Sequence, residues 1–249
     1  MINLDIVSIY IKIVIAYNVN ILAIGAHPDD IELGCGGTLL KASKQGHNIY
    51  LYTVTRGGSA GQVIRRSNEL VNSAKSMGAS ILWIDDYEDS KVYLTKELIN
   101  SIEFFIKKSK ADIIYTHPLN DNHHDHRAIA QATIEAGRFI PNIFGYENPS
   151  TRNFNPNMYY DISDTIEAKI SLIKLHESQE SKMFLNSNSV RGLSEHRAIQ
   201  TRLDEKIVNV ESFEVIKISF EKDLTLLKTR KKIKDDLYTP KQVLEFILK

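Results

Sequence analysis

The sequence of 249 residues is poor in cysteine and has no excess of either charge. Its one cysteine, Cys35, excludes a disulfide framework and a cysteine-rich zinc module. A chain with a single cysteine suits a reducing compartment, and we therefore predict a cytoplasmic protein. The 31 basic residues balance the 31 acidic ones, which leaves no overall field to hold a polyanion, and we predict no nucleic-acid partner. A composition that is 43% apolar and 25% charged indicates a globular domain.

The first 19 residues are apolar, yet they lack the marks of a signal peptide or a membrane span. The first charge is Asp5, Lys12 interrupts the apolar run, and no small-residue cleavage site follows. The run is also too short and too charged to cross a bilayer. We therefore predict a soluble protein with no membrane span, in which residues 1–19 are an N-terminal extension. Membrane association of this segment is the alternative.

From residue 20 onward, short β-rich runs alternate with amphipathic helical runs. We predict strands at residues 20–26, 47–55, 79–84, 112–116 and 142–146. One helix is predicted to follow the first strand and to end near residue 45, and three more are predicted at residues 65–77, 95–109 and 127–137. Strands that alternate with helices in this way indicate an α/β fold with a mostly parallel sheet and helices on both faces. We assign residues 20–220 to one domain.

The second half of this domain is less regular. We predict loops at residues 148–157 and 187–194, a helix at 164–177 and a late strand at 212–220. Residues 221–249 are predicted to be a C-terminal basic helical tail. Its cluster of lysines and arginines is typical of a solvated helix face, so the tail does not change the expectation about nucleic acid.

Polar residues gather after three of the predicted strands. Residues 27–30 (HPDD) follow the first strand, residues 56–59 (RGGS) follow the second, and the histidine-rich residues 117–126 follow the strand at 112–116. Ligands of open α/β sheets bind beyond the carboxyl ends of the strands. We therefore expect these loops to converge on one crevice that contains the active site.

The spacing of His27 and Asp30 suits a shared metal ion. Three residues apart across a strand-to-helix turn, an imidazole and a carboxylate lie on the same side. Asp29 then points elsewhere and is free to act as a base. The alternative is that Asp29 or Asp30 only caps the following helix, because aspartate is a preferred N-cap residue.

The second cluster favours the metal interpretation. Residues 122–127 (NHHDHR) place three imidazoles and a carboxylate at another strand exit, and adjacent histidines are seldom core residues because each needs a buried polar partner. A solvent-exposed loop would explain one such cluster but not two at corresponding strand ends. Three His and Asp ligands with an open fourth position are the pattern of a catalytic zinc, or of a similar divalent transition metal.

Cys35 lies in a glycine-rich run, residues 34–37 (GCGG). A thiolate at a helix N-terminus could act as a ligand or nucleophile. The pattern favours a small apolar residue in a tightly packed turn, because buried cysteine usually behaves as a small hydrophobe. The glycines do not form the GxGxxG pattern of a dinucleotide loop, which counts against a nucleotide-dependent oxidoreductase.

Two motifs together carry a family resemblance. AIGAHPDDIELGCGGTL (23–39) and HHDHR (123–127) resemble the PIG-L/LmbE-type zinc-dependent N-deacetylases. The resemblance extends from about Asn20 to Phe213 and includes Arg66-x-x-Glu69. It implies a Rossmann-like core and a hydrolase that uses zinc to remove the N-acetyl group from an N-acetylglucosamine-type amino sugar or its conjugate.

The resemblance also implies roles for individual residues. The metal ligands would be His27, Asp30 and His126, the catalytic residues Asp29, His123 and Asp125, and the substrate-binding residues Arg66 and Asp89. Asp29 would be the general base. Protonated His123, held by a hydrogen bond to Asp125, would polarise the amide oxygen and stabilise the oxyanion. Arg66 would contact the sugar, and Asp89 would bind a sugar hydroxyl.

Two features depart from the common family pattern. Ile31 separates Asp30 from Glu32, where the common form is AHPDDE, and Gly58 stands where many members carry glutamate. The second departure removes the basis for predicting substrate contacts in that loop.

Two alternative functions stay open. The chain could be a metal-dependent amidase that acts on a non-sugar amide, or a non-catalytic Rossmann-like protein that binds a sugar or nucleotide. The presence of Asp29 beside all three predicted ligands argues against a binding protein. We expect a small-molecule N-acetylated amino sugar or glycoconjugate as the partner, and the sequence leaves a homo-oligomer open.

Overall fold

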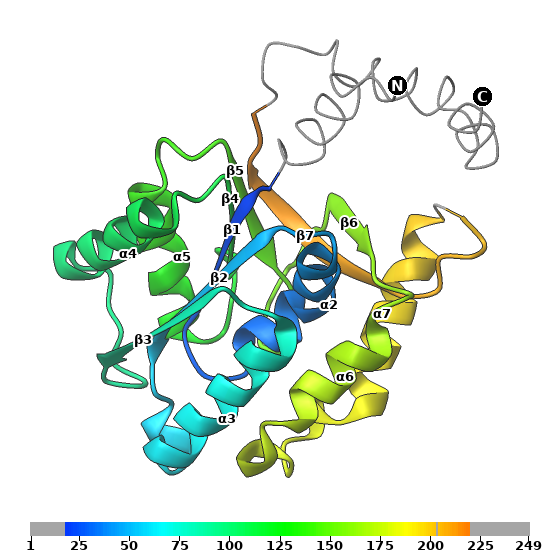
Figure 1. Ribbon diagram of the computed structural model, residues 1–249, viewed down its shortest axis with the longest axis horizontal. Coiled ribbons are helices and arrows are strands. Elements are labelled where there is room, and N and C mark those ends of the chain that lie inside the picture. Colours follow the sequence, from blue (N-terminus) through cyan, green and yellow to red (C-terminus); the bar gives the residue numbers. More distant parts are fainter. Residues whose placement is uncertain (1–17, 203, 220–249) are drawn as a thin grey trace, which may run out of the picture. The chain divides into compact units, whose positions relative to one another are not determined.

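The computed structural model describes residues 18–202 and 204–219, whose strands form one seven-stranded sheet (Figure 1). The strands are β1 (Asn20–Gly25), β2 (Asn48–Thr55), β3 (Ile81–Tyr87), β4 (Ile113–Thr116), β5 (Asn142–Tyr146), β6 (Met158–Asp161) and β7 (Val210–Lys217). They lie in the order β3-β2-β1-β4-β5-β7-β6. Strands β1 to β5 pair in parallel, whereas β7 runs antiparallel to both β5 and β6. The predicted mostly parallel sheet is confirmed.

Helices cover both faces of the sheet (Figure 1). They are α2 (Asp30–Lys44), α3 (Val63–Met77), α4 (Lys96–Ser109), α5 (His124–Ala136), α6 (Ile166–Lys174) and α7 (Ser187–Thr201). Side chains of α2, α3 and α6 share one apolar core cluster with the sheet, and those of α4 and α5 share another. Two separate cores are what a parallel sheet requires, because its strands are apolar on both faces.

The central strand β1 shows why the sequence folds this way. It lies between β2 and β4, and every residue after Asn20 is buried, so its sequence is a continuous apolar run. The parallel neighbours β4 and β5 end at the same edge of the sheet as β1. This edge therefore collects the segments that follow the three strands.

Helix α2 is broken at Cys35, whose backbone angles (φ −142°, ψ 17°) are not helical. A buried ion pair fits into the break. Lys169 donates from Nζ to the carbonyl oxygen of Leu33 at 2.6 Å, and Glu211 accepts hydrogen bonds from two backbone amides of the next turn at 2.8 and 2.7 Å. Because backbone groups freed by a break must find partners, this pair stabilises the bend that follows the first turn of α2.

Close packing explains the glycine-rich run inside α2. A Cβ atom on Gly34 would stand 2.1 Å from Cδ2 of Tyr146, so only glycine admits this ring. Cys35 is fully buried, and burial raises the pKa of its thiol well above the usual value. Both observations agree with the packing interpretation of the run.

The structure corrects the prediction for residues 187–194, which begin α7 and are not a loop. Only Val190, Ser194 and Ala198 of this helix are buried, a stripe too narrow to stand out among its polar residues. Asn186 caps the helix by accepting a hydrogen bond from the backbone amide of Ser189 at 2.8 Å.

Other element boundaries also differ from the prediction. Helix α5 begins at His124, three residues before the predicted start, and β6, which begins directly after the predicted loop 148–157, was not predicted. Residues 1–17 of the predicted extension and all of the predicted tail at 221–249 lie outside the described residues. Among the helices that the structure describes, none has the length and apolar character needed to cross a bilayer.

Candidate metal centre

The segments that follow β1, β4 and β5 meet beside the first turns of α2 and α5. They line a cavity of about 380 Å³, whose wall includes His27, Asp29, Asp30, His126 and Asn148. The first predicted polar cluster and the third therefore converge, as the strand order requires. The second, residues 56–59, contributes Ser59 to the wall.

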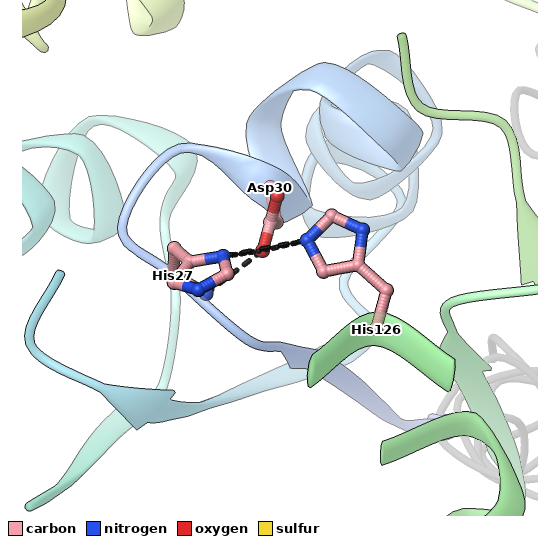
Figure 2. Close-up of side chains that lie close together, drawn as sticks. All are labelled: His27, Asp30 and His126. Atoms are coloured by element: carbon pink, nitrogen blue, oxygen red, sulfur yellow. Dashed lines mark hydrogen bonds and ion pairs between the residues drawn. The ribbon is translucent and has the colours of Figure 1, made fainter. Parts of the chain in front are cut away.

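Three donor atoms in this cavity form a nearly equilateral triangle (Figure 2). Nδ1 of His27 lies 3.3 Å from Oδ2 of Asp30, and Nε2 of His126 lies 3.4 Å from the same oxygen. The two nitrogens are 3.3 Å apart. Ligands at about 2.0–2.1 Å from a tetrahedral zinc stand about 3.3–3.4 Å from one another. The donor set and its spacing therefore fit a small divalent ion.

The backbone and a neighbouring amide hold the carboxylate of Asp30 in place. Its Oδ2 accepts hydrogen bonds from the amides of Ala26 (3.1 Å) and His27 (2.8 Å), and its Oδ1 accepts one from Nδ2 of Asn148 (3.1 Å). Burial alone would raise the pKa of Asp30, but the adjacent imidazoles of His126 and His117 hold it well below its usual range. The carboxylate is ionised, as a metal ligand must be.

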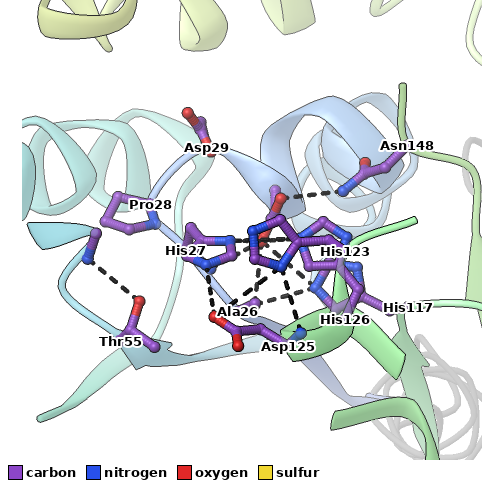
Figure 3. A network of polar contacts seen from close by, with 12 residues as sticks. Ala26, His27, Pro28, Asp29, Thr55, His117, His123, Asp125, His126 and Asn148 are labelled. Atoms are coloured by element: carbon purple, nitrogen blue, oxygen red, sulfur yellow. Dashed lines mark hydrogen bonds and ion pairs between the residues drawn. The ribbon is translucent and has the colours of Figure 1, made fainter. Parts of the chain in front are cut away.

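The outer ring nitrogens of both histidines face carboxylates, and Figure 3 shows the contact between His27 and Asp125. Nε2 of His27 lies 3.1 Å from Asp125 and 3.1 Å from Asp89, and Nδ1 of His126 lies 3.2 Å from Asp121. A carboxylate on the outer nitrogen fixes the tautomer of a ligating histidine and raises its basicity. This pattern supports Nδ1 of His27 and Nε2 of His126 as the inward-facing donors.

These carboxylates also set the charge of the two imidazoles. Burial would lower the pKa of His27, but hydrogen bonds with Asp125, Asp30 and Asp89 raise it well above its usual value. Burial likewise opposes the rise at His126, where Asp30 and Asp121 raise the pKa to about 9. Without a metal, both imidazoles hold a second proton at neutral pH and are positively charged. An incoming cation would displace one proton from each ring.

Asp29 occupies the N-cap position of α2, but its side chain makes no capping hydrogen bond. Its backbone angle φ of +116° lies in the left-handed region, which costs a non-glycine residue about 1–3 kcal/mol. Burial, together with the charge of Asp30, raises its pKa to about 6. The strained turn therefore directs a carboxyl group of raised pKa into the cavity, and the structure does not support the capping alternative.

Arg66 is buried and bound to the turn that carries Asp29, whereas the sequence analysis assigned it to the sugar. Its guanidinium donates to the carbonyl oxygens of Gly57 (2.8 Å) and Pro28 (2.7 Å) and lies 3.3 Å from Oδ2 of Asp29. Of its three side-chain nitrogens, only Nε makes no hydrogen bond within the described residues. Arg66 thus holds the turn that carries Asp29, and it also lines the metal cavity, so its contact with the sugar stays a prediction.

Asp89 and Asp125 also have partners that the sequence analysis did not predict. Besides its contact with His27, Asp89 accepts a hydrogen bond from the backbone amide of Ser59 at 2.9 Å. The carboxylate of Asp125 is 4.0 Å from Nδ1 of His123, too far for the predicted hydrogen bond. It instead accepts from the amides of Ser90 (2.8 Å) and Val92 (3.0 Å), which aim it at His27.

His123 lies beside the donor triangle, with its ring centroid 4.7 Å from that of His27. Its Nδ1 accepts a hydrogen bond from the backbone amide of Asp125 at 3.3 Å, which places the proton of a neutral ring on Nε2. Burial and the charges of His27 and His126 lower its pKa. These surroundings favour a neutral ring, not the protonated one that we expected.

The sequence analysis missed four residues of this network. His117, Asp121 and Asn148 contact the donors, and the hydroxyl of Tyr146 donates to the carbonyl oxygen of Ile24 at 2.8 Å and lies 3.2 Å from Nε2 of His117. Burial lowers the pKa of His117 to about 4, so its neutral ring accepts the amide of Ala26 at 3.0 Å. Asp121 lies two residues before His123, within the polar run 117–126, and this position is the sequence feature that could have indicated its contact with the site.

Comparisons with known proteins point to one family of deacetylases. A family model described as GlcNAc-PI de-N-acetylase (PIG-L) matches residues 22–137. The uncharacterized deacetylase YaiS of Escherichia coli K12 is 37% identical over 167 residues, which cover 64% of this chain and 90% of that protein. The diacetylchitobiose deacetylase of Thermococcus kodakarensis is 30% identical over 185 residues, which cover 64% of this chain and 69% of that protein.

Solved structures share the fold at lower identity. The N,N′-diacetylchitobiose deacetylase of Pyrococcus horikoshii matches with a TM-score of 0.70 at 19% identity, over 87% of this chain and 93% of that one. A 4-carboxy-2-hydroxymuconate hydratase of Pseudomonas putida matches with the same TM-score at 18% identity, over 83% and 99%. Two different activities on one fold mean that the reaction must be argued from the site.

Proposed function

The chain belongs to the PIG-L family, and from this premise we propose that it is a metal-dependent hydrolase that removes the N-acetyl group from an N-acetylglucosamine-type amino sugar or its conjugate. The names of two relatives, a deacetylase and a diacetylchitobiose deacetylase, support the reaction and the substrate class. Zinc is the proposed ion, because two imidazoles and one carboxylate with no thiolate are a typical donor set for it.

One observation carries the proposal. The donor triangle of His27, Asp30 and His126 and the carboxyl group of Asp29 line the same cavity. A metal site of purely structural use needs no ionisable group beside it. A strained turn that holds such a group, with a pKa of about 6, supports a reaction that moves a proton near neutral pH.

The residues divide the chemistry among them. When bound, a divalent ion supplies a Lewis acid, which acidifies water and polarises a carbonyl oxygen. Asp29 accepts the proton of the attacking water, and Arg66 holds that carboxylate in position. Nε2 of His123 donates a hydrogen bond to the amide oxygen as negative charge develops there, an interaction typically worth about 3–4 kcal/mol. Asp29, which holds the proton taken from the water, is the group from which the leaving amine takes a proton.

A phosphate-bearing cofactor fits this site poorly. The amides of Ala26 and His27, at the strand-to-helix turn where a phosphate would bind, already donate to Asp30. The buried carboxyl groups of Asp29, Asp30 and Glu32 surround the start of α2 and would repel an anion. The geometry therefore opposes the nucleotide-binding alternative.

A mass-spectrometric screen tests the proposed function. Metal-free protein, with and without added zinc, is incubated with N-acetylglucosaminyl compounds and, as a control panel, with N-acetylated amino acids. We expect acetate from the sugars only when the metal is present. Acetate from the amino acids alone would identify an amidase of another class, and zinc-loaded protein that binds these sugars without releasing acetate would identify a binding protein.

A further inference from the structure

A glycine-rich loop forms part of the wall of the metal cavity. Residues 57–61 (GGSAG), which we call the glycine loop, follow β2 and include the short 3₁₀ helix η1 (Gly58–Ala60). Ser59 and Ala60 line the metal cavity. Four of the five residues are exposed and three are glycines, which lose more conformational freedom on folding than any other residue. The loop therefore depends on contacts with the rest of the domain to keep one position.

One such contact links the glycine loop to the metal centre. The backbone amide of Ser59 donates to Oδ2 of Asp89 at 2.9 Å, and its hydroxyl donates to the carbonyl oxygen of the same residue at 3.1 Å. Oδ1 of Asp89 lies 3.1 Å from Nε2 of His27. A carboxylate at the outer nitrogen orients a ligating histidine and strengthens metal binding. The loop thus holds a carboxylate that orients a proposed ligand.

A second contact comes from Gln179, in the short 3₁₀ helix η2 (Glu177–Gln179). Its Nε2 donates to the carbonyl oxygens of Ala60 and Ser178, each at 3.1 Å. Carbonyl oxygens only accept, so these contacts identify the nitrogen as the end that faces the loop. Gln179 is 1% exposed, and its Oε1 has no hydrogen-bond partner among the described residues. Because an unpaired buried oxygen costs free energy, stability alone does not account for a glutamine here.

Helix η2 is itself fixed to two helices of the domain. The amide and the hydroxyl of Ser178 donate to the carboxylate of Glu69 in α3, at 2.9 and 2.5 Å. Nε2 of His176, which directly precedes η2, lies 3.3 Å from Oε1 of Glu32 in α2, and both side chains are buried. These contacts make Gln179 a firm anchor for the exposed loop.

We infer that Gln179 is a positioning residue for the metal centre. Its amide holds the glycine loop at Ala60, which keeps the amide of Ser59 on Asp89. Asp89 in turn orients the imidazole of His27. The inference rests on the proposed function, because it takes His27 as a metal ligand, and it gives a role to the polar cluster that follows β2.

Zinc affinity tests the inference separately from turnover. Gln179→Met keeps the length of the side chain but removes the donor. Loss of a residue that contacts a ligand typically lowers metal affinity by about 10–100-fold, and Gln179 acts one contact further out, so we expect a loss of about 5–10-fold. Chelator competition on the metal-free protein, at one fixed pH, measures it. Gln131→Met, at an exposed position of α5, is the matched control and should bind zinc like the wild type.

A double-mutant cycle shows whether Gln179 acts through Asp89. Asp89→Ala should lower zinc affinity by about 10–100-fold. In that background the loop has no carboxylate left to hold, so Gln179→Met should lower the affinity by less than about twofold, whereas independent residues would show the full loss again.

A second pair of variants tests the same contact from the exposed loop, where a substitution perturbs folding least. Ser59→Pro removes the amide hydrogen that Asp89 accepts and should lower zinc affinity by at least about 5–10-fold. Ser59→Ala keeps that amide and should stay within about twofold of the wild type. Equal affinities in these two variants would contradict the inference.

The outcomes distinguish this inference from the proposed function. A lower melting temperature of Gln179→Met with unchanged zinc affinity would show that Gln179 only packs, and an unchanged zinc affinity with a raised KM would assign the loop to the substrate; either result refutes the inference. The expected zinc affinities without acetate release from any substrate would refute the function and support the inference. A wild-type protein that binds no zinc would refute both.

Discussion

The two adjoining cavities of this protein are built in opposite ways. The wall of the metal cavity comes mainly from the short segments that follow strands β1 to β5, in which backbone amides fix carboxylates such as those of Asp30 and Asp125. A second cavity, of about 400 Å³, shares Leu33, Pro149 and Phe184 with it. Its lining comes mainly from α2, η3 (Met183–Leu185), α7 and β7, and combines apolar side chains with the ion pairs Lys169–Glu211 and Arg197–Glu147. The difference teaches that the proposed chemistry is encoded locally, whereas the shape of the space beside it depends on the whole second half of the domain.

The sharpest way to break this comparison is to remove a donor from the triangle. His126→Ala removes a ligand, and it also removes the imidazole that lies between the carboxylates of Asp30 and Asp121. Loss of a residue that only contacts a ligand typically lowers metal affinity by about 10–100-fold, and His126→Ala should lower it further. Elemental analysis and chelator competition measure the loss. His196→Ala, at an exposed histidine of α7 outside the triangle, is the matched control. Zinc occupancy like that of the wild type in His126→Ala would remove this residue from the site.

A change beneath the second cavity should act on stability instead. Lys169→Met leaves the buried carboxylate of Glu211 unpaired, which costs about 3–5 kcal/mol of unfolding free energy. Urea denaturation measures this loss, and Lys174→Met, the same substitution at an exposed position of α6, is the control. Each folded chain of Lys169→Met should still bind one metal ion. A Lys169→Met protein as stable as the control would show that the pair does not stabilise the break in α2.

The pH dependence of metal binding should distinguish the polar cavity further. In the metal-free protein the pKa of His27 is raised well above its usual value and that of His126 to about 9, so both protons must leave when a cation binds. Affinity should therefore rise with pH, by up to about 100-fold per unit between pH 6 and 8, because two protons leave for each ion bound. Chelator competition across this range measures the slope, and an affinity that stays constant or falls would contradict the assignment.

The smallest expected effect concerns an outer partner. Asp121→Asn keeps the size of the side chain but removes the charge that faces Nδ1 of His126, so metal affinity should fall by about 10–100-fold. The pH dependence of metal affinity should also become shallower, because Asp121 is one of the two carboxylates that raise the pKa of His126. Asp86→Asn, at an exposed carboxylate, controls for the change of net charge. Equal affinities in the two variants would show that Asp121 does not orient His126.

The sequence predicts the first half of the fold well, because each strand and helix there has a local signal. β1 is a continuous apolar run, HPDD (27–30) follows it, and parallel pairing alone brings that turn to the end of β4. The donor triangle could therefore be proposed from two motifs far apart in the chain. The roles that the family resemblance gives to Asp29 and His123 stay predictions, since geometry places them beside the triangle without testing them.

Long-range contacts account for what the sequence could not predict. Arg66 matches a family position assigned to the sugar, but its partners Gly57 and Pro28 become neighbours only when the loop after β2 folds over the turn that carries Asp29. Helix α7 was missed because a single buried stripe stabilises it. Asn148 follows β5 in a segment that reads only as a loop, and nothing local indicates its contact with Asp30.

The central claim is that the strained turn holds a metal ligand and a base side by side, and a comparison of Asp29→Ala with Asp30→Ala tests it most directly. Metal content and kcat for acetate release are measured on both variants and on the wild type. We expect Asp29→Ala to keep its zinc and lose at least about 10²-fold in kcat, the usual worth of a positioned general base. Asp30→Ala should lose metal first and regain part of its activity in excess zinc. A stable, zinc-loaded Asp29→Ala protein with normal kcat would contradict the account.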